Sequence, residues 1–364
     1  MVGLGGGLHL CRLPHTLFYP SLFVAYNMGS WVGRRTIAVS DDVWVMLNEL
    51  KLELGARTLN DVILKLLERY FEVEFTEFVR EAYGEADADR SKPLAYPGSD
   101  WWIKDKLLDL ISRSGCRVLV EVFGGSGVVS MYAPRDQFKV IVYNDIDGLL
   151  TNFFEVLRDR PRELRERLLK MPASRREVAK YAEMIVSGEV EKLDPVEKAA
   201  VWFYVVSLSF DSKVVGGFSV VRERSTTKAV TLSRKLVSLE EYARRWAGVS
   251  IENMDFRKLI PTYDTPNTVF YCDPPHLPVR EKERKDYYRF KFTESDMKDL
   301  LELLDGIKGK FVLRLTSDNL EYDFIKDWVS KYKVETVEHG MFMVKSKGET
   351  RPRLTTLLIY NYNI

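Results

Sequence analysis

The tetrapeptide Asp273-Pro274-Pro275-His276 holds the residue types in this chain that could do chemistry together. A carboxylate beside the carbonyl of a proline-stiffened backbone presents two fixed hydrogen-bond acceptors, and a histidine ring can stack on a planar group. Two acceptors and a stacking face suit an aromatic amine, such as the exocyclic amino group of adenine or cytosine. Holding the amino hydrogens out of the ring plane would localise the nitrogen lone pair for attack on an electrophile.

The residues before this tetrapeptide predict where its carboxylate lies. Residues 269–272 are β-branched, aromatic or otherwise apolar, which is typical of a short buried strand, and the two prolines end it. Asp273 would therefore follow the carboxyl end of a strand, at the edge of an open α/β sheet where ligands bind. A strand followed by an ordinary Asp-Pro turn is the alternative interpretation of these residues taken alone.

A second group of residues indicates a bound nucleoside. Residues 118–123 predict a buried strand that runs into Gly124-Gly125-Ser126-Gly127. Glycines between a strand and a helix let the backbone approach a ligand closely and direct helix amides at it. The next predicted strand, 140–143, ends in Asn144-Asp145, and an acidic residue there is where nucleotide-binding folds hold ribose hydroxyls. Loop and acid lie about twenty residues apart, which fits that geometry.

The composition sets broad limits on the protein. A chain of 364 residues, 46% hydrophobic and 29% charged, predicts one large domain and something small beside it. A net charge of +1 gives no global case for nucleic acid, so local basic patches would have to meet it. The cysteines lack metal or disulfide spacing and the four histidines are scattered. We therefore expect no metal site, no membrane span and a reducing, cytoplasmic compartment.

The amino-terminal region divides into three predicted segments. Residues 1–33, which include Met28 just ahead of the first patterned segment, are expected to be disordered or not translated. Residues 34–72 combine one alternating run with two amphipathic helical patterns that meet at Gly55. Residues 73–92 are rich in charge and predict a linker, so that the main domain would span 93–364.

The pattern over 34–72 resembles the ribbon-helix-helix family, in which two chains pair their strands into a ribbon that enters the DNA major groove. The resemblance implies a DNA-binding and dimerisation unit, hence a homodimer, in which Arg34 and Thr36 face outward. A local helical hairpin packed on the next domain is the alternative.

Several motifs occur in an order that resembles the Dam-like class of DNA adenine (N6) methyltransferases. These motifs are residues 96–99, 121–127, 144–147 and 271–275, and the resemblance continues through 287–288, 292–294, 308–313 and 355–362. It covers roughly residues 92–364, and several ordered motifs are far more specific than any one of them. The resemblance implies an α/β fold with a Rossmann-like mixed sheet, a helical target-recognition insert at 155–250, S-adenosylmethionine as cofactor and double-stranded DNA as partner.

The resemblance also assigns roles to residues. Asp273 and the Pro274 carbonyl would grip the amino group of a flipped adenine, with Pro275 and the stacking His276 completing the catalytic motif. The residues expected to hold S-adenosylmethionine are Tyr96, Pro97, Gly98, Ser99, Phe123, Gly124, Gly125, Ser126, Gly127, Asp145 at its ribose and Asp255 at its adenine. The further residues expected to contact DNA are Arg222, Arg224, Lys228, Arg234, Lys235, Tyr287 and Tyr288. A solvated charged face is the alternative for the basic run, and a flexible lid for the tyrosine-bearing loop.

Three positions depart from the pattern of that class. Asp100 stands where a lysine is usual, His276 where a tyrosine is usual, and Val122 where a proline is common. Asp100 reverses the charge beside the expected cofactor, and Lys104 or Lys106 could substitute from the following helix.

The sequence thus predicts a site-specific adenine methyltransferase, and its alternative is a catalytically weakened homologue that acts as a DNA-binding regulator. A cytosine amino group or an RNA target is chemically open as well. A place in restriction-modification is a hypothesis that the resemblance alone carries.

Overall fold

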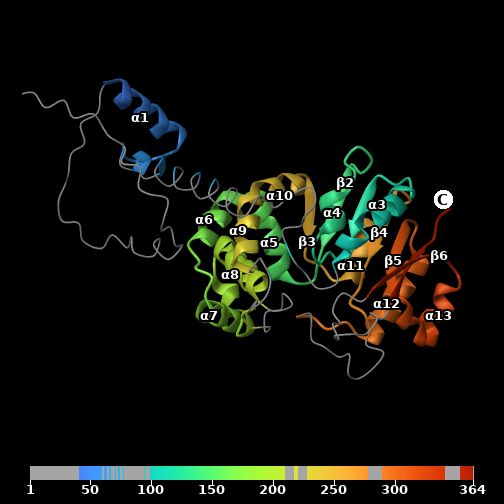
Figure 1. Cartoon of the computed structure of the whole chain (residues 1–364). Helices are drawn as coiled ribbons and strands as arrows, with labels where there is room; N and C mark the ends of the chain where they lie inside the picture. The colour runs from blue at the N-terminus through green and yellow to red at the C-terminus, as the bar shows by residue number, and fades with distance from the viewer. Residues whose placement is uncertain are drawn as a thin grey trace, which may run out of the picture. The chain divides into compact units, whose positions relative to one another are not determined.

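The structure is a computed structural model that describes most of the chain (Figure 1). The described residues are 41–59, 61–63, 65, 66, 70, 73, 77, 94, 99–209, 217–219, 228–277, 289–340 and 353–363. The chain divides into two compact units, one of residues 1–71 with 170–172 and one of the remaining residues. The predicted leader, the predicted strand at 35–40 and the predicted DNA contacts Arg34 and Thr36 lie outside the described residues.

A seven-stranded mixed sheet is the centre of the larger unit, with the order β3-β2-β1-β4-β5-β7-β6. The strands are β1 (Val118–Glu121), β2 (Val140–Asn144), β3 (Val249–Glu252), β4 (Thr268–Cys272), β5 (Lys310–Thr316), β6 (Lys333–Gly340) and β7 (Arg353–Tyr360). The first five pair in parallel, and β7 runs antiparallel to both β5 and β6. The predicted α/β fold with a mixed Rossmann-like sheet is confirmed.

The direction in which strands are added to the sheet changes at β1. From β1 the chain proceeds outward to β2 and β3, and it then returns to place β4 on the other side of β1. The segments after β1 and β4 therefore leave the same edge of the sheet side by side, and a crevice at such a switch point is where open α/β sheets bind ligands. A main-chain hydrogen bond of 2.9 Å from Val122 N to Tyr271 O ties the two strand ends together.

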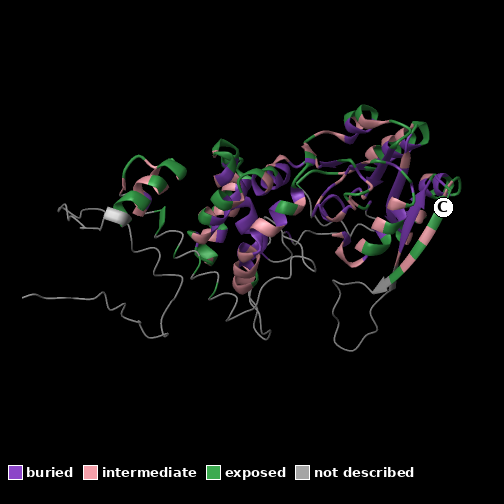
Figure 2. Ribbon diagram, turned by 90° about the horizontal axis from the view of Figure 1, so that it is seen from above, coloured by how far each residue is buried: buried purple, intermediate pink, exposed green. Residues whose placement is uncertain are grey.

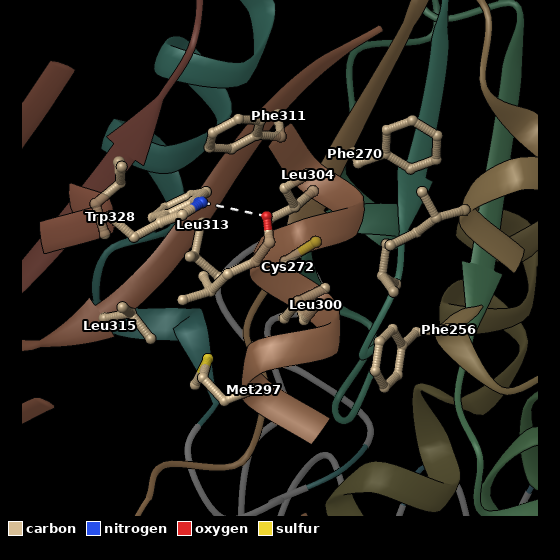
Figure 3. Packing of buried hydrophobic residues seen from close by; sticks show 14 of the residues in the cluster. Phe256, Phe270, Cys272, Met297, Leu300, Leu304, Phe311, Leu313, Leu315 and Trp328 are labelled. Atoms are coloured by element: carbon tan, nitrogen blue, oxygen red, sulfur yellow. Dashed lines mark hydrogen bonds between the residues drawn. The ribbon is translucent and has the colours of Figure 1, made fainter. Parts of the chain in front are cut away.

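β4 lies in the middle of the sheet because its side chains are apolar on both faces. All five residues of β4 are buried, as the continuous apolar run 269–272 predicts. On one face the sheet packs against α11 (Phe256–Tyr263), α12 (Glu294–Gly306) and α13 (Asp323–Val329). Figure 3 shows this cluster, in which Phe311 and Leu313 of β5 meet Leu300 and Leu304 of α12.

One hydrogen bond satisfies a polar group inside this cluster. Trp328 Nε1 donates to the Leu301 carbonyl over 3.1 Å, the dashed line of Figure 3. A buried indole N–H without a partner would weaken the core, so this bond allows α13 to pack its tryptophan against β5 and α12.

Two 3-10 helices and one α-helix are further elements of this unit. They are η2 (Asp100–Trp102), α3 (Lys104–Ser112) and η6 (Ser317–Glu321). The helix α4 (Val128–Tyr132) follows the glycine loop and contacts β1 and β2.

The region between β2 and β3 is helical, as predicted for residues 155–250. It contains α5 (Gly148–Asp159), α6 (Pro161–Leu169), α7 (Arg175–Val186), η3 (Glu189–Lys192), α8 (Pro195–Leu208), α9 (Lys228–Val237) and α10 (Leu239–Trp246). Asp194 caps α8 by accepting from Val196 N and Glu197 N, and Pro195 occupies its first turn. Eleven of its residues are buried, so α8 is the centre of this helical layer, whose buried interior is visible in Figure 2.

The smaller unit contains α1 (Asp41–Glu53), followed by Gly55 with a φ of 58°. Thr58 and Asp61 then exchange hydrogen bonds of 2.8 and 3.1 Å, which is the reciprocal cap expected at a helix start. Large apolar side chains of α1 are exposed, among them Trp44 at 54% and Met46 at 60%. The predicted domain limits at 33, 72 and 92 stay predictions.

Among the described helices, none combines the length and the apolar content that a membrane crossing requires.

Candidate active site

A pocket opens at the edge of the sheet where β1, β2 and β4 end. The residues that line it and that the sequence analysis had assigned to the site are Ser99, Phe123, Gly124, Gly125, Ser126, Asp145, Asp273 and Pro275. The structure thus brings residues of both predicted groups into one cavity, whereas the predicted residues Gly127, Asp255, Pro274 and His276 do not line it. The cavity is also lined by Asp100, Ile146, Asp147, Arg289 and Phe290, to which the sequence analysis assigned no site role.

Several predicted residues cannot be placed relative to this pocket. Those outside the described residues are Tyr96, Pro97, Gly98, Arg222, Arg224, Tyr287 and Tyr288. Of the motif that contains the first three, the structure describes Ser99, whose Oγ lies 2.9 Å from Ser126 Oγ in the glycine loop.

The glycine loop after β1 lies too close to neighbouring rings to carry side chains. A Cβ atom on Gly124 would stand 2.1 Å from the buried Tyr143 ring. Gly127 has a φ of 65°, and a Cβ atom there would stand 2.5 Å from the Trp246 ring. Tyr143 Oη also donates to the Gly125 carbonyl over 2.9 Å. The loop is therefore held against the end of β2, with its backbone open to the pocket.

Asp145 links this loop to the end of β2. Its carboxylate accepts from Gly125 N and from Asp147 N, each over 2.9 Å, and Asn253 Nδ2 donates to its backbone carbonyl over 2.8 Å. Burial raises the pKa of Asp145 to about 6, against the lowering effect of the two backbone donors. The carboxylate is fixed in position, and each oxygen keeps a lone pair that a ligand hydroxyl could use.

Asp255 does not line the described pocket. Its carboxylate accepts from Arg257 N at the start of α11, over 2.8 Å, and pairs with the Arg257 guanidinium at 3.1 Å. The preceding Met254 exchanges hydrogen bonds of 2.8 and 3.1 Å with the Asn144 side chain, so the segment lies against the end of β2. The contact of Asp255 with a cofactor adenine stays a prediction.

Asp273 follows β4 and belongs to a buried charge network. Its Oδ2 accepts from Arg314 Nη1 over 2.6 Å, and the same Nη1 lies 3.0 Å from Asp100 Oδ1. Tyr271 Oη donates to Asp100 Oδ2 over 2.7 Å. Asp273 Oδ1 is buried and has no hydrogen-bond partner among the described residues. A buried carboxylate oxygen beside a cavity and without a donor is an acceptor available to a ligand.

The network changes the acidity of its members. Burial raises the pKa of Asp100 to about 6 and also raises the pKa of Asp273, while the Arg314 guanidinium opposes both shifts. Burial disfavours a charge on Arg314, but the two carboxylates outweigh it and raise the pKa of Arg314 above its ordinary value. The guanidinium is therefore the permanent positive charge of this site.

Lys104 and Lys106, which could substitute for the missing lysine, do not line the described pocket. Lys104 pairs with Asp105 at 2.7 Å, and Lys106 pairs with Glu335 at 3.3 Å. The cation beside Asp100 comes from β5 instead, as Arg314. The sequence analysis missed this arginine because its partners come from two distant segments of the chain.

Of the remaining residues of the tetrapeptide, Pro275 lines the pocket, whereas Pro274 and His276 do not. Pro274 is buried, Pro275 is half-buried and the His276 side chain is exposed. Enclosure by surrounding protein, and to a smaller extent the Arg314 guanidinium, lowers the pKa of His276 to about 4. The imidazole is therefore neutral at pH 7.

Glu121, the last residue of β1, is a second buried acid that the sequence analysis did not assign. It is 1% exposed and accepts from Ser130 N, in the first turn of α4, over 2.8 Å. Burial raises the pKa of Glu121 to about 8, against the lowering effect of the hydrogen bonds from Ser130. An acid inside an otherwise apolar strand, next to a glycine loop, was the available sequence signal.

Replacing Glu121 with glutamine is expected to stabilise the fold increasingly as the pH rises. The folded pKa of about 8 lies above the 4.5 of the ordinary carboxyl, so wild-type unfolding releases a proton between these values and becomes easier as pH rises. Glutamine keeps an acceptor for Ser130 N and lacks this dependence. In urea unfolding, the gain in unfolding free energy should be at least about 1 kcal/mol larger at roughly pH 8.5 than at roughly pH 5.5. An equal gain at both pH values would contradict the assignment.

Arg289 and Asp147 close one side of the pocket. Arg289 Nη1 donates to Asp147 Oδ1 over 2.6 Å, and Asp147 also caps α5 by accepting from Leu149 N over 3.0 Å. Burial raises the pKa of Asp147, and the Arg289 guanidinium opposes that shift.

The described basic residues of the predicted DNA patch lie on α9. Lys228, Arg234 and Lys235 are all half-buried, and Lys235 Nζ lies 6.0 Å from the centre of the Phe203 ring. Their contact with DNA stays a prediction. Within the described residues no three His, Cys, Asp or Glu side chains gather as a metal ion would require.

Comparison with known proteins identifies one family. A family model described as D12 class N6 adenine-specific DNA methyltransferase matches residues 96–343, which is more than half of the chain. The match includes every residue that lines the pocket. No curated protein matches the chain.

Proposed function

Because this chain belongs to the D12 class of N6 adenine-specific DNA methyltransferases, we propose that the pocket at the edge of its sheet is where adenine is methylated. The class establishes the reaction and its DNA substrate, and it implies S-adenosylmethionine as methyl donor. The single observation that carries the location is the unpartnered Asp273 Oδ1 beside the glycine loop.

The residues of the pocket fit S-adenosylmethionine. The loop packs closely on the Tyr143 and Trp246 rings because Gly124 and Gly127 lack side chains, and its residues Gly124, Gly125 and Ser126 line the pocket, where a nucleoside could contact the backbone. The fixed Asp145 carboxylate would accept from ribose hydroxyls. S-Adenosylmethionine supplies a methyl group on a positively charged sulfur, and the acidic lining of Asp100, Asp147 and Asp273 favours a cation.

Asp273 and the Pro274 carbonyl would act on the adenine amino group. Each accepts one amino hydrogen, which aims the nitrogen lone pair at the methyl carbon. When bound, S-adenosylmethionine would supply the methyl group and keep the electron pair of its C–S bond on sulfur, and the amino nitrogen would lose one proton to solvent. No residue of the chain needs to form a covalent bond.

The target base would have to leave the duplex to reach these acceptors. The Asp273 side chain is only 14% exposed, and an adenine inside a stacked duplex cannot bring its amino group to a carboxylate at that depth. The exposed His276 ring belongs to the same tetrapeptide as Asp273, and it could stack on the flipped base.

Transfer of labelled methyl groups from S-adenosylmethionine to mixed-sequence duplex DNA, followed by nucleoside analysis, tests the function. The proposal requires label in N6-methyladenine. Label in methylated cytosine, or transfer only to RNA, would overturn the choice of target. Cofactor binding in calorimetry without any transfer would favour a DNA-binding regulator that kept the fold.

We further propose that the amino-terminal unit pairs two copies of the chain. Large apolar side chains of α1 are exposed in the single chain, including Leu52 at 83%, and a second copy of the unit would cover them. Sedimentation equilibrium of the intact chain should give the mass of a dimer, and of a variant with Trp44→Glu and Met46→Glu that of a monomer. A dimer in both cases would rule out α1 as the interface.

A further inference from the structure

We propose that Arg314, held by Asp100, is a positioning residue that fixes the Asp273 carboxylate for methyl transfer. The inference deepens the proposed function, since it concerns how the amine-binding acceptor is kept in place. It assigns a role to Asp100, which stands where the motif pattern described above usually has a lysine.

The geometry makes Arg314 the link between the two carboxylates. Its Nη1 lies 2.6 Å from Asp273 Oδ2 and 3.0 Å from Asp100 Oδ1. The residues Arg314 and Asp100 are buried, at 5% and 7% exposed. The hydroxyl of Tyr271 holds the other oxygen of Asp100 over 2.7 Å. Each member of the chain Tyr271, Asp100, Arg314 and Asp273 is thus oriented by its neighbour.

The strand register places Arg314 beside Asp273. Cys272 of β4 is paired with Leu313 of β5, so the next residue on each strand is a member of the network. The arginine side chain therefore needs no loop to carry it, and its position relative to Asp273 is set by the sheet. Since Arg314 occupies Oδ2 of Asp273, the unpartnered Oδ1 is the oxygen left for substrate.

The charges explain why a cation is required at this place. Two carboxylates close together in a poorly solvated site repel each other, and one of them would take up a proton. A protonated Asp273 presents a hydroxyl donor in place of an acceptor, which cannot receive an amino hydrogen. Arginine suits the task because its guanidinium stays charged when buried and can contact two oxygens at once.

Titratable groups surround Asp273 from several elements. Those that interact with Asp273 are Arg314 of β5, Asp100 of η2, and Tyr271 and Cys272 of β4. His276 interacts with Arg314 and Asp100, and Asp100 in turn raises the pKa of the buried Glu121 of β1. Among these, Arg314 is the cation that pairs with Asp273 directly. Removing it should therefore raise the pH that Asp273 needs to ionise, and removing the Asp100 charge should lower that pH.

Three variants test the inference in the intact chain. Arg314→Met should lower kcat about 10²-fold and move the acid limb of the kcat profile to higher pH, while the KM for S-adenosylmethionine changes by less than about threefold. Arg314→Lys, which keeps the charge, should return kcat to within about tenfold of wild type. Asp100→Asn should move the acid limb to lower pH. In the pair Asp100→Asn with Arg314→Met, the loss in kcat should be smaller than in Arg314→Met alone, because one anion is gone.

The matched control is Arg113→Met. Arg113 Nη2 also lies between two carboxylates, 3.0 Å from Asp109 Oδ2 and 3.4 Å from Glu335 Oε1, outside the pocket. It should leave kcat and the pH profile unchanged. An Arg314→Met enzyme that folds and keeps the wild-type kcat and acid limb would overturn the inference.

A second readout does not depend on activity. Carbon-13 NMR of the Asp273 carboxyl should report a higher pKa in Arg314→Met and a lower one in Asp100→Asn. If wild type transferred no methyl group but these shifts appeared, the proposed function would fail and the network would stand. If wild type were active and the Asp273 carboxyl titrated in Arg314→Met and in Asp100→Asn as it does in wild type, the role of the network would be ruled out and the proposed function would stand. Should Arg314→Met not fold, Asp100→Asn and Arg314→Lys carry the same test.

Discussion

Replacing Asp273 with asparagine is expected to reduce kcat for adenine methylation about 10³-fold, with binding of S-adenosylmethionine changed less than about threefold. An asparagine side chain has one acceptor and one donor where aspartate has two acceptors. Arg314 donates to the Oδ2 position over 2.6 Å and therefore selects the orientation with the amide oxygen there. The amide NH₂ group then points at the substrate amino group, so a donor meets a donor.

Single-turnover methyl transfer and calorimetry of cofactor binding measure the two halves of this expectation. Asp305→Asn is the matched control, because Asp305 also pairs with a cation, Lys331 at 2.9 Å, and lies outside the pocket. It should keep wild-type turnover. An Asp273→Asn enzyme with kcat within about tenfold of wild type would show that Asp273 is not the amine acceptor, because removing one such electrostatic contact usually costs more.

Replacing Gly127 with alanine is expected to lower the free energy of unfolding by about 3 kcal/mol. Two costs combine. A φ of 65° is unfavourable for alanine, and the new Cβ atom would lie 2.5 Å from the ring of Trp246, which is 0% exposed and cannot move into solvent. The same collision would push the glycine loop from its place, so cofactor binding should weaken together with stability.

Gly115→Ala separates the two costs. Gly115 has a φ of 69°, nearly that of Gly127, but a Cβ atom there meets nothing within 4 Å. It should cost about 1 kcal/mol, the backbone contribution alone. Urea unfolding of both variants measures the difference, and equal losses would mean that the contact with Trp246 is relieved without cost.

The sequence predicted the parts of the site that depend on local pattern. The buried strand before Asp273 was recognisable because β4 is apolar on both faces and ends at two prolines. The glycine loop and Asp145 were recognisable because each follows a strand directly. Once the sheet order placed β1 between β2 and β4, these separate predictions converged in one pocket.

The parts that the sequence could not supply depend on pairing between distant segments. Arg314 stands inside an apolar strand, and its meaning emerges only when β5 is aligned with β4 and Asp100 is brought beside both. Asp255, which does not line the described pocket, has local partners instead: its carboxylate caps α11 and pairs with Arg257 two residues on. Such a short-range cap competes with a ligand for the same oxygen atoms, and residue type alone does not show which one is bound.

The hydrogen bond from Val122 N to the Tyr271 carbonyl joins the two halves of the pocket through the main chain. The glycine loop after β1 and the Asp273 carboxylate after β4 are thus held at the spacing of two neighbouring strands, about 4.8 Å, although a long helical region separates them in sequence. That region leaves the sheet after β2 and returns at β3, on the side of β1 away from β4. Changes to helices of that region that do not contact the glycine loop, unlike α10 with its Trp246, are therefore expected to leave the two halves of the pocket aligned.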